Sequence, residues 1–218
     1  MKEELPSAGY VSASAIIAGA ASVLFFSIVA SSFAQSIGGT KPIQIVAFGA
    51  SQTAGKTVSP DHAYPSQLER RLRTEGFNVN VVNQGSSGDT TEDERNRLER
   101  AIPTGTDIVL FQPGTNDCNR KGHTGEDQMA KNLATMLSWM KDRHLHVLVL
   151  GGDCYEDVQA SLPGKYGFAY YGKMAQGLKD FPRPDGQHFT AEGYAHMAEL
   201  LLPSVKKMIV ELGTSTDK

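Results

Sequence analysis

Short apolar runs alternate with longer mixed stretches from residue 43 onward. Four runs have the length of strands, and nearly all of their residues are apolar, which is typical of strands buried on both faces of a sheet. They lie at Ile43–Phe48, Val79–Val82, Asp107–Gln112 and His146–Leu150. Since helical patterns separate the runs, the sequence predicts a parallel sheet covered by helices on both faces.

The intervening stretches carry helix start and stop signals. Gly76 follows a predicted helix at Tyr64–Glu75, and Thr91–Glu94 (TEDE) predicts a capping box that starts a helix ending at Ile102. Another helix is expected to begin after the cap residue Thr124. It carries a stripe of apolar residues at helical spacing, typical of a core: Met129, Leu133, Met136, Leu137 and Met140.

The last third of the chain is less regular. Thr190 is expected to cap a final helix that has one apolar face. The stretch Tyr155–Phe181 shows no clear fifth strand and is expected to be mostly loop. The predicted sheet therefore has four to five strands.

The first 40 residues follow a different pattern. No charged residue occurs from Leu5 to Thr40, and residues 15–30 are almost wholly apolar (AIIAGAASVLFFSIVA). This length fits a secretion signal, and the small residues of 32–34 (SFA) place its cleavage after residue 34. Two glutamates near the N-terminus weaken the signal's usual positive charge, so an uncleaved membrane anchor through residues 11–34 is the alternative. Both interpretations make 35–218 one exported domain, periplasmic or secreted.

Composition narrows the class of protein. Hydrophobic residues make up 40% of the 218 and charged residues 21%, values typical of a globular domain. The 21 Lys and Arg against 24 Asp and Glu give a net charge of −3, which offers no electrostatic reason to expect nucleic acid as a partner. No sequence feature implies a protein partner.

The loop after the first strand admits two interpretations. Residues 50–57 (ASQTAGKT) fit a relaxed phosphate-loop pattern, but a nucleotide site would need a helix starting at Lys56 and Thr57. The next residues, VSPDHAYP, contain two prolines and no helical periodicity, which disfavours that reading. In the other interpretation Ser51, just past the carboxyl end of a parallel strand, is a nucleophile.

Polar segments also follow the later strands. They are 87–90 (SGDT), 114–117 (GTND) and 185–188 (DGQH), the last lying just before the final helix. Together with 48–55 (FGASQTAG), these blocks resemble, in the same order, those of the SGNH (GDSL) hydrolases. The resemblance is closest to the small bacterial arylesterase, thioesterase and lysophospholipase branch, and it spans about 43–205.

That resemblance implies a three-layer α/β/α sandwich of the flavodoxin-like type and a serine hydrolase that forms an acyl-enzyme on Ser51. His188 would be the general base, and Asp185 the residue that orients it. The oxyanion hole would consist of the N–H groups of Ser51 and Gly88 and the side-chain amide of Asn116. These residue types suit the chemistry, because a serine needs a base within hydrogen-bonding reach and a nearby carboxylate fixes the imidazole. No cofactor and no metal is expected.

One position departs from the family's pattern, which has Asp immediately before the nucleophile where this chain has Ala50. That Asp is thought to steady the loop, so its loss bears on turnover more than on mechanism. It leaves an alternative function, a degenerate domain that binds an acyl or acetylated-glycan ligand with little catalysis.

The substrates that the resemblance implies are small-molecule esters with short acyl or aryl groups, with thioesters and lysophospholipids also in the class. Four aromatic residues before Asp185 either wall an acyl pocket or pack a long loop onto the domain; they are Tyr166, Phe168, Tyr170 and Tyr171.

The two cysteines are expected to pair. Cys118 follows the third predicted strand and Cys154 the fourth, and both loops should leave neighbouring strands at the same edge of the sheet. An exported chain with an even cysteine count favours a disulfide over two separate thiols.

Overall fold

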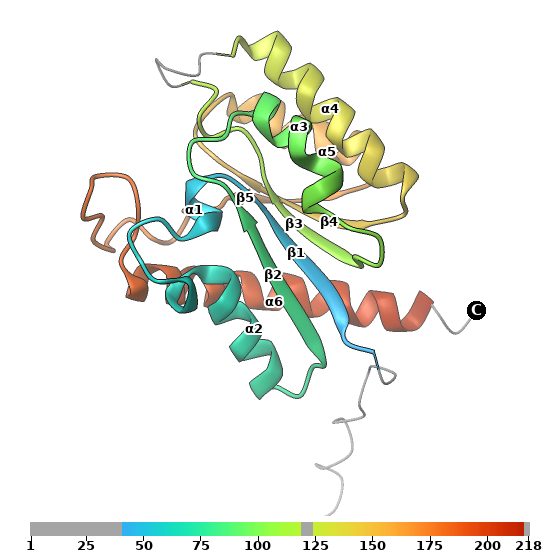
Figure 1. The fold of residues 1–218 in the computed structure, drawn as a ribbon, viewed down its shortest axis with the longest axis vertical. Helices are drawn as coiled ribbons and strands as arrows, with labels where there is room; N and C mark the ends of the chain where they lie inside the picture. Colours follow the sequence, from blue (N-terminus) through green and yellow to red (C-terminus); the bar gives the residue numbers. More distant parts are fainter. Residues whose placement is uncertain (1–40, 119–123, 216–218) are drawn as a thin grey trace, which may run out of the picture. The chain divides into compact units, whose positions relative to one another are not determined.

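Five strands form one parallel sheet in the computed structural model, which describes residues 41–118 and 124–215 (Figure 1). Their order across the sheet is β2-β1-β3-β4-β5, the flavodoxin-like arrangement, so the predicted fold class is confirmed. The strands are β1 (Ile43–Gly49), β2 (Val79–Gly85), β3 (Ile108–Gln112), β4 (His146–Gly151) and β5 (Ala169–Lys173).

Helices cover both faces of this sheet, as Figure 1 shows. One face is covered by α2 (Tyr64–Thr74) and α6 (Ala191–Ser215), and the other by α3 (Thr91–Ala101), α4 (Glu126–Asp142) and α5 (Glu156–Lys165). Side chains alternate along β1: Ile45 and Ala47 belong to the α2–α6 core, whereas Val46 and Phe48 belong to the other. Because both faces are buried, the strand reads as a continuous apolar run.

Two helices begin one residue away from the position that the sequence predicts, α3 one residue earlier and α4 one residue later. Thr90, not Thr91, caps α3: its Oγ1 accepts the N–H of Asp93, and the Asp93 carboxylate accepts the N–H of Thr90. The capping box is thus shifted by one residue, and Glu94 faces the protein interior. Similarly, Gly125 and not Thr124 is the cap of α4. The apolar stripe of α4 is buried as predicted.

The stretch expected to be loop contains both α5 and β5. Its strand pattern is broken by Gly172, whose φ is +97°, and the pairing of β5 with β4 shifts register between Val149 and Leu150. Tyr166, Phe168, Tyr170 and Tyr171 pack against the two cores. The second interpretation of these aromatic residues, packing rather than lining a pocket, is therefore the one that the structure supports.

Strands β1, β2 and β3 end at the same level of the sheet. Gly49, the last residue of β1, is paired with Gly85 of β2 and with Gln112 of β3, each of which is also the last residue of its strand. The short helix α1 (Ser51–Ala54) follows β1 directly. It lies so close to the end of β2 that a Cβ atom on Gly85 would be 2.1 Å from the Ala54 nitrogen.

Residues 1–40, on which the signal or anchor prediction falls, lie outside the described part of the chain. Within residues 41–118 and 124–215, no helix combines the length and the apolar character that crossing a membrane requires.

Candidate active site

Ser51 and His188 meet although 137 residues separate them in the sequence. Ser51 is the first residue of α1, and its Oγ lies 2.7 Å from Nε2 of the buried His188. Nδ1 of His188 lies 2.7 Å from Oδ2 of Asp185, in the loop before α6. A hydroxyl, an imidazole and a carboxylate bonded in this order allow the imidazole to take the hydroxyl proton. The structure brings these three predicted residues together.

The loop around Asp185 keeps its carboxylate charged. Oδ1 accepts the backbone N–H groups of His188 at 2.8 Å and Gln187 at 3.0 Å, while Oδ2 faces the imidazole. The N–H of His188, then the imidazole, then the N–H of Gln187 hold the pKa of Asp185 well below its usual range. A carboxylate that is ionised near neutral pH fixes the orientation of a hydrogen-bonded imidazole ring and stabilises its protonated form.

Hydrogen bonds from α1 and the residues after it hold the histidine loop. Gln52 Nε2 donates to the Gln187 carbonyl at 2.8 Å, and Thr57 Oγ1 donates to the Phe189 carbonyl at 2.9 Å. Tyr194 of α6 donates to Gln52 Oε1 at 3.2 Å. The sequence did not single out Gln52, because a glutamine beside a serine gives no signal of its own.

The predicted oxyanion residues lie in the loops after β2 and β3. Gly88 has a φ of +94°, a left-handed backbone conformation that residues with a side chain rarely adopt. The Asn116 amide donates to the carbonyl of Asp89 at 2.8 Å, which holds its side chain beside the Gly88–Asp89 segment. The structure therefore places Asn116 next to the Gly88 loop.

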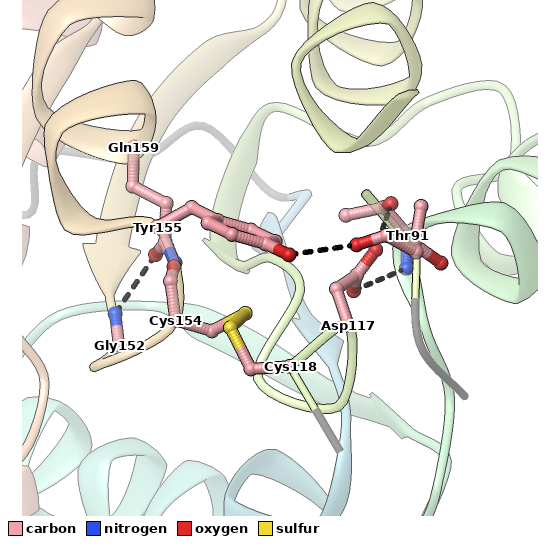
Figure 2. Close-up of a disulfide and its surroundings, with 8 residues drawn as sticks. Thr91, Asp117, Cys118, Gly152, Cys154, Tyr155 and Gln159 are labelled. Carbon is pink, nitrogen blue, oxygen red and sulfur yellow. Dashed lines mark hydrogen bonds between the residues drawn. A yellow bond between two sulfur atoms is a disulfide. The ribbon is translucent and has the colours of Figure 1, made fainter. Parts of the chain in front are cut away.

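Two buried carboxyl groups hold the Asn116 loop from behind. Asp117 accepts the N–H of Thr91 at 2.9 Å and its hydroxyl at 2.6 Å, as Figure 2 shows, and Glu94 Oε2 accepts the N–H of Gly114 at 3.3 Å. Burial raises the pKa of Asp117, and it raises the pKa of Glu94 more strongly. Both groups connect the loop to the first turn of α3.

Cys118 and Cys154 form the expected disulfide, with their Cα atoms 5.6 Å apart (Figure 2). Cys118 lies two residues after Asn116, so the bond joins the Asn116 loop to the loop that follows β4. Gln159 accepts the N–H of Gly152 at 2.8 Å and thereby fixes the β4 side of this connection.

The phosphate-loop interpretation finds no support in the geometry. Gly55 ends α1 in a left-handed conformation, and Thr57 also has a positive φ, of 82°. The next α-helix begins only at Tyr64, so no helix N-terminus lies at Lys56 and Thr57. Among the described residues, no three His, Cys, Asp or Glu side chains are placed to hold a metal ion.

A pocket with a volume of about 80 Å³ lies at the carboxyl ends of β3, β4 and β5. Gln52 and Thr115, the neighbours of Ser51 and Asn116 in the chain, contribute to its wall. Gln112, which also lines the pocket, connects α1 to the loop after β3, because it accepts the Thr53 hydroxyl at 3.0 Å and donates to the Thr115 hydroxyl at 3.2 Å.

Comparison with known proteins adds to this geometry. Residues 47–189 match the model of the GDSL-like lipase/acylhydrolase family. An arylesterase from Vibrio mimicus is 31% identical over 149 residues, which are 68% of this chain and 66% of that protein. This chain therefore spans slightly less than two thirds of that relative's length.

Solved structures share the fold. The crystal structure of TesA superposes with a TM-score of 0.69 at 22% identity, covering 76% of this chain and 99% of TesA. The lipase/acylhydrolase from Enterococcus faecalis gives a TM-score of 0.64 at 25% identity, covering 76% of this chain and 96% of that one.

Removing the disulfide should lower stability. The Cys118→Ala/Cys154→Ala double variant leaves no free thiol, and losing a closed loop of 36 residues should reduce the free energy of unfolding by about 3–4 kcal/mol. Urea denaturation of the oxidised parent and the variant measures the difference. Alkylation without prior reduction, read by mass spectrometry, is the companion test: two alkylated cysteines in exported protein would contradict the bond.

Asp185→Asn should remove a pH-dependent contribution to stability. Because the pKa of Asp185 is lower in the folded protein than the value of about 3.9 expected in an unfolded chain, the carboxylate stabilises the fold fully above that value. The stability difference between parent and variant should be constant from about pH 7 to pH 5. It should shrink as the pH falls through the lowered folded-state pKa. The exposed Asp180→Asn is the matched control, and a difference that grows in acid would contradict the assignment.

Proposed function

Because this chain belongs to the GDSL-like lipase/acylhydrolase family, as its four sequence blocks predicted, we propose that it is an esterase that forms an acyl-enzyme on Ser51. The observation that carries this proposal is the hydrogen-bonded series of Ser51, His188 and Asp185, in which both distances between side chains are 2.7 Å. The arylesterase relative supports ester hydrolysis as the reaction.

In this mechanism Ser51 Oγ attacks the ester carbonyl carbon while Nε2 of His188 takes the hydroxyl proton. Asp185 stabilises the imidazolium that forms. When the carbon–oxygen bond of the ester breaks, the same proton passes to the leaving alcohol, and the acyl group stays on Ser51. Water then attacks the acyl-enzyme with His188 as base, which releases the carboxylic acid and restores the serine.

We assign the oxyanion hole to the N–H groups of Ser51 and Gly88 and to the Asn116 amide. The hydrogen bond from Asn116 to the Asp89 carbonyl supports this assignment, because it keeps the amide beside the peptide that follows Gly88. An asparagine donates N–H groups without adding a charge that would be costly to bury. Preorganised donors of this kind stabilise the negative oxygen of the tetrahedral intermediate.

Ala50 does not favour the alternative of a non-catalytic binding domain. Its side chain is fully buried, and α1 begins directly after it without a side-chain cap. The hydrogen bond between Ser51 and His188 is nevertheless short, so the nucleophile is aligned without a carboxylate at residue 50. This supports catalysis in the present sequence.

The pocket supports short acyl esters as substrates. A volume of about 80 Å³ is roughly half that of a cavity of about 150 Å³ that holds a benzene ring. Met174 and Met197 contribute apolar surface, while Gln52 and Thr115 contribute polar groups. Ser51, Asn116 and His188 do not line this pocket, and Asp153, Lys173 and Arg183 do, so its assignment to a short acyl chain is part of the proposal and rests on its neighbourhood to Ser51 through Gln52.

We further propose that the protein works outside the cytoplasm. The Cys118–Cys154 disulfide supports this, because such bonds persist in oxidising compartments. The apolar run at residues 15–30 supports export by a signal or an anchor.

Ser51→Ala should abolish esterase activity. The parent is expected to hydrolyse p-nitrophenyl acetate, and loss of the nucleophile should lower kcat by at least about 10,000-fold. A fluorophosphonate probe should label Ser51 in the parent and fail to label the His188→Ala variant. Ser161→Ala, at an exposed serine on α5, is the control and should keep full activity and labelling. A correctly folded parent that neither turns over nor labels would favour the non-catalytic alternative.

The acyl-length profile tests the assignment of the pocket. Values of kcat/KM for p-nitrophenyl acetate and butyrate should exceed the value for the octanoate by at least about tenfold, because the longer chain cannot be buried in this volume. Steady-state kinetics below the solubility limit of each ester measures the profile. A preference for octanoate would contradict the assignment while leaving the serine mechanism intact.

A further inference from the structure

Arg97, in the second turn of α3, connects three separate segments near the site. Its Nε lies 2.5 Å from Asp89 Oδ2, Nη1 donates to the Gln84 carbonyl at 2.9 Å, and Nη2 donates to the Gly49 carbonyl at 2.9 Å. The guanidinium also lies over the Phe48 ring, 4.5 Å from its centroid. The side chain is only 12% exposed. The acceptors come from the ends of β1 and β2 and from the loop after β2.

Two of these segments, those of Gly49 and Asp89, lead to residues of the proposed mechanism. The Gly49 carbonyl, which also accepts the N–H of Ser86 at 2.9 Å, lies two residues before Ser51. Asp89 follows Gly88, and its carbonyl accepts the amide of Asn116. Arg97 is thus bonded to the main chain before the nucleophile and to the residue that holds the oxyanion donors.

We propose that Arg97 is a positioning residue that sets the spacing between Ser51 and the oxyanion donors Gly88 and Asn116. It acts on the nucleophile segment through the carbonyl of Gly49, and therefore requires no side chain at residue 50, where this sequence has Ala50. The inference rests on the proposed esterase function, since it assigns a role within the same site.

The chemistry of the side chain suits this role. A guanidinium presents five N–H donors in a rigid planar fork, so three acceptors bound by one group are held in fixed relative positions. Asp89 balances its charge, and the bond from Ser86 Oγ to Asp89 Oδ1 at 2.6 Å fixes the other carboxylate oxygen. A lysine has a single charged nitrogen and cannot span the same three acceptors.

Kinetics of three variants in the full chain tests the role. Arg97→Met should lower kcat by about 10- to 100-fold and change KM less than about threefold, because a displacement of the order of 1 Å affects the reaction more than substrate binding. Arg97→Lys should recover only part of kcat. Arg100→Met, at an exposed arginine on the same helix, should match the parent. A kcat for Arg97→Met within twofold of the Arg100→Met value would overturn the proposal.

A double-mutant cycle separates positioning from general loss of stability. Asn116→Ala removes the donor that Arg97 holds through Asp89 but leaves the contact with Gly49, so adding Arg97→Met to that variant should lower kcat by a smaller factor than it does in the parent. Losses that simply multiply would overturn the proposal. If Arg97→Met does not fold, Arg97→Lys combined with Asn116→Ala completes the same comparison.

A readout without turnover distinguishes this inference from the proposed function. The side-chain NH₂ signals of Asn116, identified by their loss in Asn116→Ala, should shift in the nitrogen–proton spectrum of Arg97→Met and stay unchanged in Arg100→Met. An inactive parent that shows this shift would reject the esterase function but keep the structural coupling. An active parent with unchanged Asn116 signals would keep the function and reject the role of Arg97.

Discussion

The common level at which β1, β2 and β3 end is the constraint on which the site depends. Gly49 is paired with the last residue of both neighbouring strands, so the three following segments leave the sheet together. The order of strands reverses around β1, with β2 on one side and β3 on the other, and in such sheets a crevice forms at this point. The segment that carries Ser51 therefore lies between the loops of Gly88 and Asn116, and the loop before α6 brings His188 to the same edge, as its bond to Ser51 requires.

Carboxyl groups around this edge lie in two contrasting electrostatic environments. Asp185 is partly exposed and receives backbone N–H groups, which lowers its pKa and keeps it an anion that can stabilise an imidazolium. Glu94 and Asp117 are buried behind the Asn116 loop, and burial raises their pKa values. The charge on Asp185, which the proposed mechanism needs, is thus stabilised by hydrogen bonds, whereas burial disfavours the charged forms of Glu94 and Asp117, which hold the loop.

The sequence was sufficient for the features that follow a regular period or a recognisable motif. Continuous apolar runs predicted four of the five parallel strands, and the polar blocks at 48–55 and 185–188 contained the three side chains that meet, Ser51, Asp185 and His188. It was insufficient for β5, because Gly172 and a register shift interrupt the strand pattern. It also gave no sign of Arg97 or Gln52, since their roles come from bonds to backbone carbonyls that any residue provides. Contacts of this kind depend on tertiary structure, and the residue type of the acceptor does not reveal them.

The short helix α1 shows why the site and the sheet edge form one unit. Four residues are too few for a helix to be stable alone, so its conformation depends on its contacts. Ser51 bonds to the histidine, Gln52 to the loop that carries it, and Thr53 to Gln112 at the end of β3. Gly85 permits this arrangement, because a Cβ atom there would overlap the backbone of α1. Any change that displaces α1 must therefore move Ser51 relative to the histidine loop and the β3 loop at once, and the packing of a glycine at the strand end becomes a condition for the proposed mechanism.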